Sequence, residues 1–156
     1  ERPIRSGDLC YKNILIMETQ IKQQWGIRSV SYWITLILAL GIIFIGARFI
    51  LQPHVGAIGY GIPFSNEHDA VYGKIKGIRD IFSGIVLLPL LAMRMRKATA
   101  WVFTTAIVVP AVDFLIILFT NGAGDLEHLL IHGITALVMI INSFLLFSIN
   151  SQSLKG

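Results

Sequence analysis

Four long apolar segments constrain the fold of this chain more than any other feature. They cover residues 30–51, 77–93, 98–120 and 129–149. A helix rising about 1.5 Å per residue needs about 20 apolar residues to cross the roughly 30 Å hydrocarbon core of a bilayer. Because 54% of the residues are hydrophobic and only 14% are charged, polar side chains are too few to cover a water-soluble core. The sequence therefore predicts an all-α membrane protein, an up-down bundle of four transmembrane helices.

The cations beside these segments predict how the helices are oriented. Lys22 and Arg28 precede the first segment, 94–97 between the second and third segments is rich in Arg and Lys, and 121–128 holds acids but no Lys or Arg. Lys and Arg concentrate in cytoplasmic connections, so we expect both termini in the cytoplasm. A bacterial inner membrane is the expected location. These anchoring cations account for the formal net charge of +4, so nucleic acid is not an expected partner.

The parts outside the helices have different expected characters. Residues 1–16 differ from the rest, and Met17 offers a natural start, so 1–16 are expected to be an added or upstream segment. Residues 17–29 and 150–156 are expected to be cytoplasmic. They flank a single membrane domain at 30–149.

The connection at 52–76 is the longest and is expected on the outer face. Its first part, 52–64, is interrupted by Pro and Gly, which argues against a regular helix, but it is too apolar for a freely solvated loop. We therefore expect it to lie as a cap over the outer end of the helices. A helix is expected to restart with Ser65 or Asn66 as its N-cap and to run on into the second apolar segment.

Small residues and proline predict helix packing. Gly73, Gly77 and Gly84 fall on one stripe of the second helix, which is expected to face inward because helices in lipid associate through close backbone approach. Pro110 removes a backbone donor from the third segment, so a kink is expected just before Asp113.

The ionisable residues inside the apolar segments all fall in the outer half of the expected membrane. In chain order they are Arg48, Arg79, Asp80, Asp113 and His132, with Glu127 and His128 just above the fourth helix. A charged group at the bilayer centre costs about 2.5–3.5 kcal/mol on insertion scales, so these groups are expected to pair. The expected pairing joins the two arginines to the two aspartates, with Asp80 pointing inward and Arg79 partly toward the interface.

Two interpretations of this cluster are open. In a functional pocket, Asp113, His132 and Asp80 are the candidate acid–base residues. The candidate ligand-binding residues are then Arg48, Arg79, Glu127 and His128. Alternatively, the cluster is a structural ion network that only fixes how the helices meet.

No motif for a metal or a cofactor accompanies this cluster. His128 and His132 share a helix face, but Glu127 precedes the first histidine, whereas in zinc proteases the glutamate follows it. The single Cys10 cannot form an internal disulfide. We therefore expect neither a metal nor a cofactor.

Short motifs around the cluster resemble a known family. The motifs are Gly46-Ala47-Arg48-Phe49, Gly77-Ile78-Arg79-Asp80, Asp113, and His132-Gly133 followed by Thr135-Ala136. They are similar to patterns in a family of small four-helix integral membrane proteins catalogued as a domain of unknown function. More distantly they resemble the DoxX-like membrane proteins, some of which are linked to quinone or thiosulfate oxidation. The resemblance covers about 30–148 and implies the four-helix fold but no established activity.

The cluster and its setting favour a small membrane protein that binds an amphiphilic molecule, such as an isoprenoid, a quinone or a lipid-like metabolite. Its expected partners are membrane lipid, a hydrophobic small molecule and a second copy of the chain. Whether it is an enzyme is open, and acid–base isomerase or cyclase chemistry is the enzymatic form of this hypothesis. The alternatives are a structural or assembly subunit and an oligomeric proton-coupled transporter.

Overall fold

The computed structural model describes residues 25–148, and this part of the chain is all-helical with no strand. The helices are α2 (Val30–Leu51), α3 (Pro53–Tyr60), α4 (Asp69–Ala92), α5 (Arg96–Ala106), α6 (Val108–Asn121) and α7 (Leu126–Ser148). The expectations for residues 1–16, for Lys22 and for 150–156 concern residues outside the described range.

Three stretches of the described chain are long and apolar enough to span a membrane. They are α2, the continuous run of α5 and α6, and α7. α4 is 24 residues long, but Lys76, Arg79 and Asp80 reduce its hydropathy. The described chain is therefore a helical protein of membrane character with three candidate spans and one further long, more polar helix.

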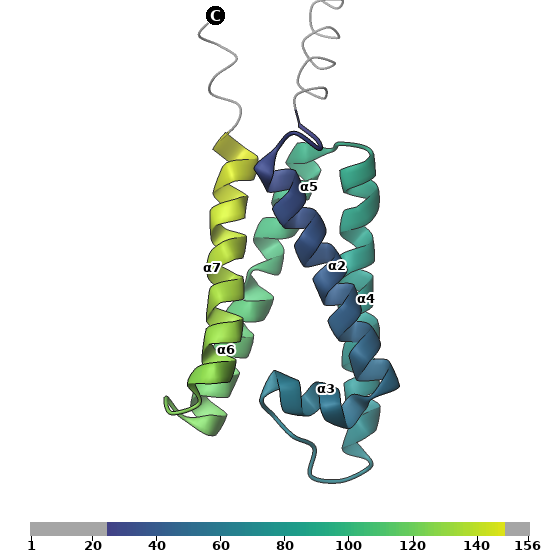
Figure 1. Cartoon of the computed structure of the whole chain (residues 1–156), viewed down its shortest axis with the longest axis vertical. Helices are drawn as coiled ribbons and strands as arrows, with labels where there is room; N and C mark the ends of the chain where they lie inside the picture. Colours follow the sequence, from purple (N-terminus) through teal and green to yellow (C-terminus); the bar gives the residue numbers. More distant parts are fainter. Residues whose placement is uncertain (1–24, 149–156) are drawn as a thin grey trace, which may run out of the picture.

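The long helices lie side by side, and α3 crosses one end of them (Figure 1). α2 packs mainly against α4, whereas α7 packs against α5 and α6. Figure 1 shows that these two groups approach each other where the described chain begins and ends, which we call the terminal end. They diverge toward the opposite end, the α3 end, where α3 lies across the gap between them.

Glycine allows α2 and α4 to touch through their backbones. A Cβ on Gly46 would lie 2.5 Å from the Gly77 carbonyl oxygen, and one on Gly77 would lie 2.6 Å from the Gly46 oxygen. A Cβ on Gly84 would lie 2.5 Å from the carbonyl oxygen of Ala39. Gly73, Gly77 and Gly84 are all buried, so the predicted inward stripe of α4 is confirmed.

A packed core closes the terminal end. Trp25, Leu91 and Phe103 are almost fully buried there, together with residues of α7. Within this region the Asn142 amide donates a hydrogen bond to the Thr35 hydroxyl (2.8 Å), joining α7 to α2. The two helix groups are thus packed together at the terminal end.

The prediction that 52–64 contains no regular helix is wrong, because α3 occupies Pro53–Tyr60. Pro53 occupies the first position of α3, where a backbone N–H would have no hydrogen-bond partner within the helix. Gly61 ends the helix with a φ of 101°, a left-handed conformation that glycine adopts without strain. Residues that were interpreted as helix breakers are therefore helix boundaries.

α4 begins at Asp69, before the apolar segment 77–93 and a few residues after the expected restart at Ser65 or Asn66. The Asn66 side-chain oxygen accepts a hydrogen bond from the Asp69 N–H (3.2 Å). The Asp69 carboxylate accepts the backbone N–H groups of Ser65 and Asn66 in return. These reciprocal bonds hold the turn just before the helix. The N-cap residue is His68, which makes no capping bond through its side chain, so the prediction of Ser65 or Asn66 as N-cap is wrong.

The third predicted segment forms two helices instead of one. α5 ends at Ala106 and α6 begins at Val108, so the α-helix is interrupted at Ile107. Pro110 cannot donate to the Ala106 carbonyl four residues earlier, and its ring crowds that carbonyl. The predicted kink is therefore present, and it lies one turn before Pro110.

Candidate functional site

A cavity of about 510 Å³ occupies the space between the two diverging helix groups. Its polar lining comprises Arg48, Tyr60, Lys76, Asp80, Ser83, Thr105, Asp113, His132 and Thr135. Its apolar lining comprises Leu38, Ile42, Phe44, Ile45, Phe49, Phe82, Val86, Leu87, Val102, Phe103, Ala106, Val109, Pro110, Ile131 and Met139. Four of the predicted site residues, Arg48, Asp80, Asp113 and His132, thus line one cavity.

The cavity wall changes from charged to apolar along the helices. On α2, Arg48 stands in the last turn beside α3, and Leu38, also in the lining, lies about 15 Å further along at 1.5 Å per residue. On α7, His132 is followed by Met139 about two turns further on. The charged end therefore lies against α3, and the apolar end points toward the packed core.

Lys76 is the partner of Asp80 in the cavity wall. Its ammonium forms an ion pair with the Asp80 carboxylate four residues along α4. The same ammonium lies 4.8 Å from the centre of the Phe49 ring and 5.0 Å from the centre of the Tyr60 ring, positions that suit cation–π attraction. Asp80 is buried, as predicted.

The predicted pairing of Arg48 and Arg79 with Asp80 and Asp113 is wrong. Lys76 lies four residues from Asp80 on the same helix face, so it reaches the carboxylate at the smallest entropic cost. Arg79 precedes Asp80 by one residue, so its side chain points about 100° away around the α4 axis. It is exposed and lies outside the cavity. Within residues 25–148, no ion pair includes either arginine.

His132, Asp113 and Tyr60 meet at the charged end of the cavity. His132 Nδ1 lies 3.9 Å from Asp113 Oδ2, and His132 Nε2 donates a hydrogen bond to the Tyr60 carbonyl (3.2 Å). The Tyr60 and His132 rings pack edge to face with their centres 4.9 Å apart. Burial, and then the nearby Asp113 carboxylate, raise the pKa of the Tyr60 hydroxyl, which therefore stays protonated. The predicted acid–base pair is thus brought together.

Three side chains from α6 and α7 hold the C-terminal end of α3, and we call them the α3 latch. Each donates a hydrogen bond to a backbone carbonyl oxygen at or just beyond that end. The bonds join Asn121 Nδ2 to Gly61 O (2.7 Å), His128 Nε2 to Ile58 O (3.2 Å) and His132 Nε2 to Tyr60 O (3.2 Å). α3 is therefore tied across the charged end of the cavity.

Asp125 supports the latch from the connection between α6 and α7. Its carboxylate accepts hydrogen bonds from the Asn121 amide and from His128 Nδ1, the latter at 2.7 Å. Both hydrogen bonds lower the pKa of the Asp125 carboxyl, and the bond from Asn121 has the larger effect. Because a neutral imidazole has one N–H, His128 donates both to Asp125 and to α3 only in its protonated form.

Two other predicted site residues lie outside the cavity. Glu127 is exposed, and His128 serves the α3 latch instead of the cavity lining. Within residues 25–148, no group of three His, Cys, Asp or Glu side chains is arranged to hold a metal ion.

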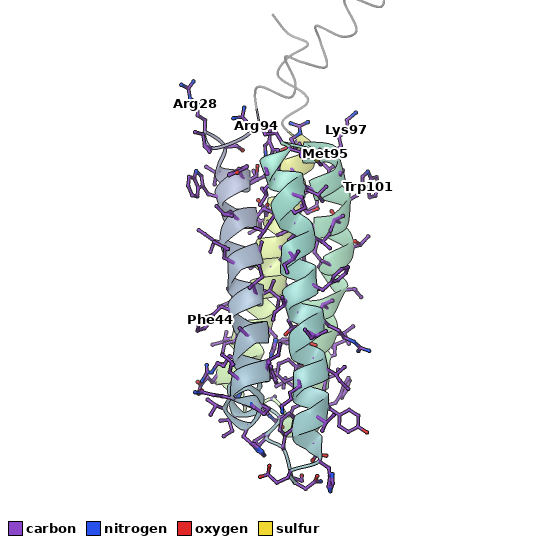
Figure 2. All side chains as sticks on the ribbon, turned by 90° about the vertical axis from the view of Figure 1, so that its right-hand side faces the viewer. Arg28, Phe44, Arg94, Met95, Lys97 and Trp101 are labelled. Atoms are coloured by element: carbon purple, nitrogen blue, oxygen red, sulfur yellow. The ribbon has the colours of Figure 1, made fainter. Side chains whose placement is uncertain are left out.

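The cavity reaches the molecular surface on two flanks. Phe44 on α2 and Ile131 on α7 line it and are exposed, and Phe44 points away from the ribbon in Figure 2. Phe82 on α4 and Val109 on α6 line it and are exposed on the other flank. Exposed apolar side chains of α2, α4, α6 and α7 therefore form part of the cavity wall.

Lys76 and Tyr60 are the functional residues that sequence reasoning missed. Tyr60 lies in the expected cap 52–64, and Lys76 lies in the expected N-terminal extension of the second helix, but neither is among the predicted site residues. The spacing of Lys76 four residues before Asp80 was a usable signal once the helix was extended back to its N-cap. Tyr60 enters the cavity only because α3 is helical, and no local pattern predicted that.

Comparison with known proteins gives one match. Residues 39–146 match a family described as "Domain of unknown function (DUF4267)". No curated protein and no solved structure matches. The matched range includes every residue of the cavity lining except Leu38. An uncharacterised family was expected from the motifs, and the more distant likeness to DoxX-like proteins stays a prediction.

Proposed function

The chain belongs to the DUF4267 family, and from its cavity we propose that it binds a small amphiphilic molecule within the membrane. The observation that carries this proposal is a cavity of about 510 Å³ with a charged end and an apolar end. Sites for drug-sized ligands measure about 300–1,000 Å³ and combine an apolar lining with a few polar groups. The polar head of the ligand lies beside α3, and its tail lies between the helices.

The proposal includes four membrane passes with both termini in the cytoplasm. α4 supplies the fourth pass, because its 24 residues are long enough to cross. Of its charged side chains, Lys76 and Asp80 face the cavity, whereas Arg79 is exposed outside it. Arg28, Arg94 and Lys97 gather at the terminal end (Figure 2), where the described chain has no acidic residue. Cations concentrate on the cytoplasmic side. A bacterial inner membrane stays the expected location.

In this placement the ligand enters from the lipid. The two flanks on which the cavity reaches the surface face acyl chains, and the lining residues there are Phe, Ile and Val. An amphiphile dissolved in the outer leaflet can slide in sideways without crossing water. This route suits an isoprenoid, a quinone or a lipid-derived metabolite better than a water-soluble substrate.

An acid–base enzyme acting on such a ligand is the second candidate function. It is favoured by the 3.9 Å approach of His132 Nδ1 to Asp113 Oδ2 inside the cavity. A base and an acid side by side in a site shielded from water can move a proton between two carbons of a substrate. Isomerisation and cyclisation are reactions of this kind. The structural-subunit alternative needs only paired charges, and it has no use for a cavity of this size.

A cavity-filling variant tests ligand binding. Thr135→Phe places a ring in the cavity lining, whereas Leu137→Phe introduces the same ring on the same helix at an exposed position outside the lining. The wild-type protein purified in mild detergent should carry one enriched amphiphile, identified by extraction and mass spectrometry. Thr135→Phe should lose most of it, and Leu137→Phe should retain it.

Equal small-molecule content in all three proteins would contradict the proposal. Asp113→Asn separates the two candidate functions in the same measurement. If the protein is an enzyme, this variant retains the ligand in an unreacted form that differs in mass or isomer composition from that of the wild type. If the protein only binds, the ligand is the same molecule in both.

A further inference from the structure

We propose that the bound amphiphile carries a single oxyanion, a carboxylate or a phosphate, and that Arg48 is its partner. This inference rests on the proposed function and adds the chemical class of the ligand head group. It follows from the distribution of charge around the cavity, and in particular from the one cation there that has no carboxylate beside it.

Each carboxylate of the cavity already has a basic neighbour. Asp80 forms an ion pair with Lys76, and Asp113 lies 3.9 Å from a ring nitrogen of His132. Arg48 lines the same cavity, but among residues 25–148 no carboxylate lies within ion-pair distance of it. Its guanidinium is therefore available to an anion from outside the chain.

Arg48 is placed where the head of an amphiphile would stop. It stands in the last turn of α2, and a Cβ on Gly59 of α3 would lie 3.8 Å from one of its guanidinium nitrogens. Arg48 lines the cavity and is also exposed, so its guanidinium lies near the α3 backbone at the outer edge of the charged end. Its planar fork of donors matches the two oxygens of a carboxylate or phosphate.

The charge balance of the lining agrees with one negative charge on the ligand. The ionisable groups are three bases, Arg48, Lys76 and His132, and two acids, Asp80 and Asp113, with the neutral hydroxyl of Tyr60 beside them. Lys76 is paired with Asp80, whereas the guanidinium charge of Arg48 has no carboxylate within ion-pair distance among residues 25–148. A single oxyanion neutralises it, which lowers the cost of keeping these groups at membrane depth.

The size of the cavity points to a single hydrocarbon chain. Its volume of about 510 Å³ lies in the lower part of the range for drug-sized ligands. The apolar lining extends from Arg48 to Leu38, about 15 Å along α2. A chain with one head group fits this space, and a phospholipid with two chains does not.

Photo-crosslinking in vesicles tests this assignment. The protein is reconstituted in phosphatidylcholine vesicles with palmitic acid that carries a diazirine in its chain, or with the corresponding hexadecanol. After irradiation, mass spectrometry measures the labelling of cavity-lining peptides. We expect the acid to label them, and Arg48→Gln to reduce this labelling about tenfold, the effect of losing a charge-assisted hydrogen bond.

Arg79→Gln is the matched control, because it removes the same charge from an exposed position outside the cavity. It should leave labelling by the acid unchanged. Arg48→Lys should retain part of it, since the charge stays and the fork is lost. Continued labelling of Arg48→Gln by the alcohol shows that the cavity of this variant is still formed.

Competition distinguishes the sources of the oxyanion. Unlabelled palmitic acid or hexadecyl phosphate should displace the probe, and phosphatidic acid, with its two chains, should not. Displacement by phosphatidic acid would overturn the single-chain assignment.

The labelling experiment has two further outcomes. Equal labelling by the acid and the alcohol, unchanged in Arg48→Gln, would overturn the proposal of an oxyanion head group but leave the proposal of ligand binding intact. Labelling of the cavity by neither probe would contradict the proposed function itself.

Discussion

Gly46 and Gly77 determine how closely α2 can approach α4. Each presents its Cα to the carbonyl oxygen of the other, at separations that leave no room for a methyl group. In lipid, where apolar surface gains little from being covered, such close approach supplies van der Waals contact over the whole helix pair. The wall of the cavity that carries Lys76 and Asp80 is fixed by this contact.

We predict that Gly46→Ala lowers the free energy of unfolding by about 1–3 kcal/mol, the usual cost of overpacking a close contact. The reason is that its methyl group would meet the Gly77 carbonyl oxygen at 2.5 Å. Denaturation in mixed micelles measures the effect. Gly41→Ala is the control on the same helix, because a Cβ there meets nothing within 4 Å. It should leave stability unchanged or raise it by up to about 1 kcal/mol. Equal effects of the two substitutions would contradict this account.

At the scale of elements, α3 is attached to both helix groups. Its N-terminus follows α2 after a single residue, Gln52, and its C-terminal end is held by the α3 latch. Both attachments are needed for α3 to cross the gap. Because the latch bonds go to backbone oxygens, they depend on the helical conformation of α3 more than on its side chains.

We predict that Asn121→Ala loosens the C-terminal end of α3. The loss of a hydrogen bond contributing about 0.5–1.5 kcal/mol should make amides in and just after Pro53–Tyr60 exchange about three- to tenfold faster. Hydrogen exchange with mass spectrometry measures this. Glu127→Gln, at an exposed position near the latch, should leave the exchange rate as in the wild type. An unchanged rate in Asn121→Ala would show that the latch does not hold α3.

At the scale of the whole molecule, charge is divided between the two ends. The terminal end of the described chain has only cations, whereas the α3 end has most of its acids in connections and first turns. This asymmetry is the basis for the proposed orientation. In the proposed orientation, the cavity lies in the outer half of the membrane.

We predict that a cysteine at position 95 reacts only from the cytoplasm and one at position 124 only from outside. Met95→Cys and Gly124→Cys are made in a Cys10→Ser background, and intact cells are treated with a membrane-impermeant maleimide. Gly124→Cys should be labelled in intact cells, and Met95→Cys only after the cells are broken. The reverse pattern would overturn the orientation, and labelling of both in intact cells would overturn the four-pass topology.

Sequence reasoning reached the helices where apolar length decides them and missed what depends on tertiary contact. α2 coincides with the predicted 30–51, because a long apolar run has few alternatives to a helix. α3 was missed because Pro53 and Gly61 are read as breakers unless the positions where a helix starts and ends are known. The gathering of Asp80, Asp113 and His132 followed from depth along the helices.

The identity of ion-pair partners could not be predicted in the same way. Depth brings Arg48, Lys76 and Arg79 to the same level, but which of them meets a carboxylate depends on the direction of each side chain around its helix. That direction is set by the divergence of the two helix groups, which opens the cavity on one side of Arg48 and leaves Arg79 outside. No local pattern encodes this divergence.

The residues that line the cavity are spread along most of the described chain, and this has a consequence for biosynthesis. They extend from Leu38 to Met139 and come from every helix from α2 to α7. The site therefore cannot exist until the last helix has left the ribosome and inserted. A chain truncated before α7 would leave Lys76, Asp80 and Asp113 without the wall that shields them, and cellular quality control could recognise those charges as a mark of an unfinished protein.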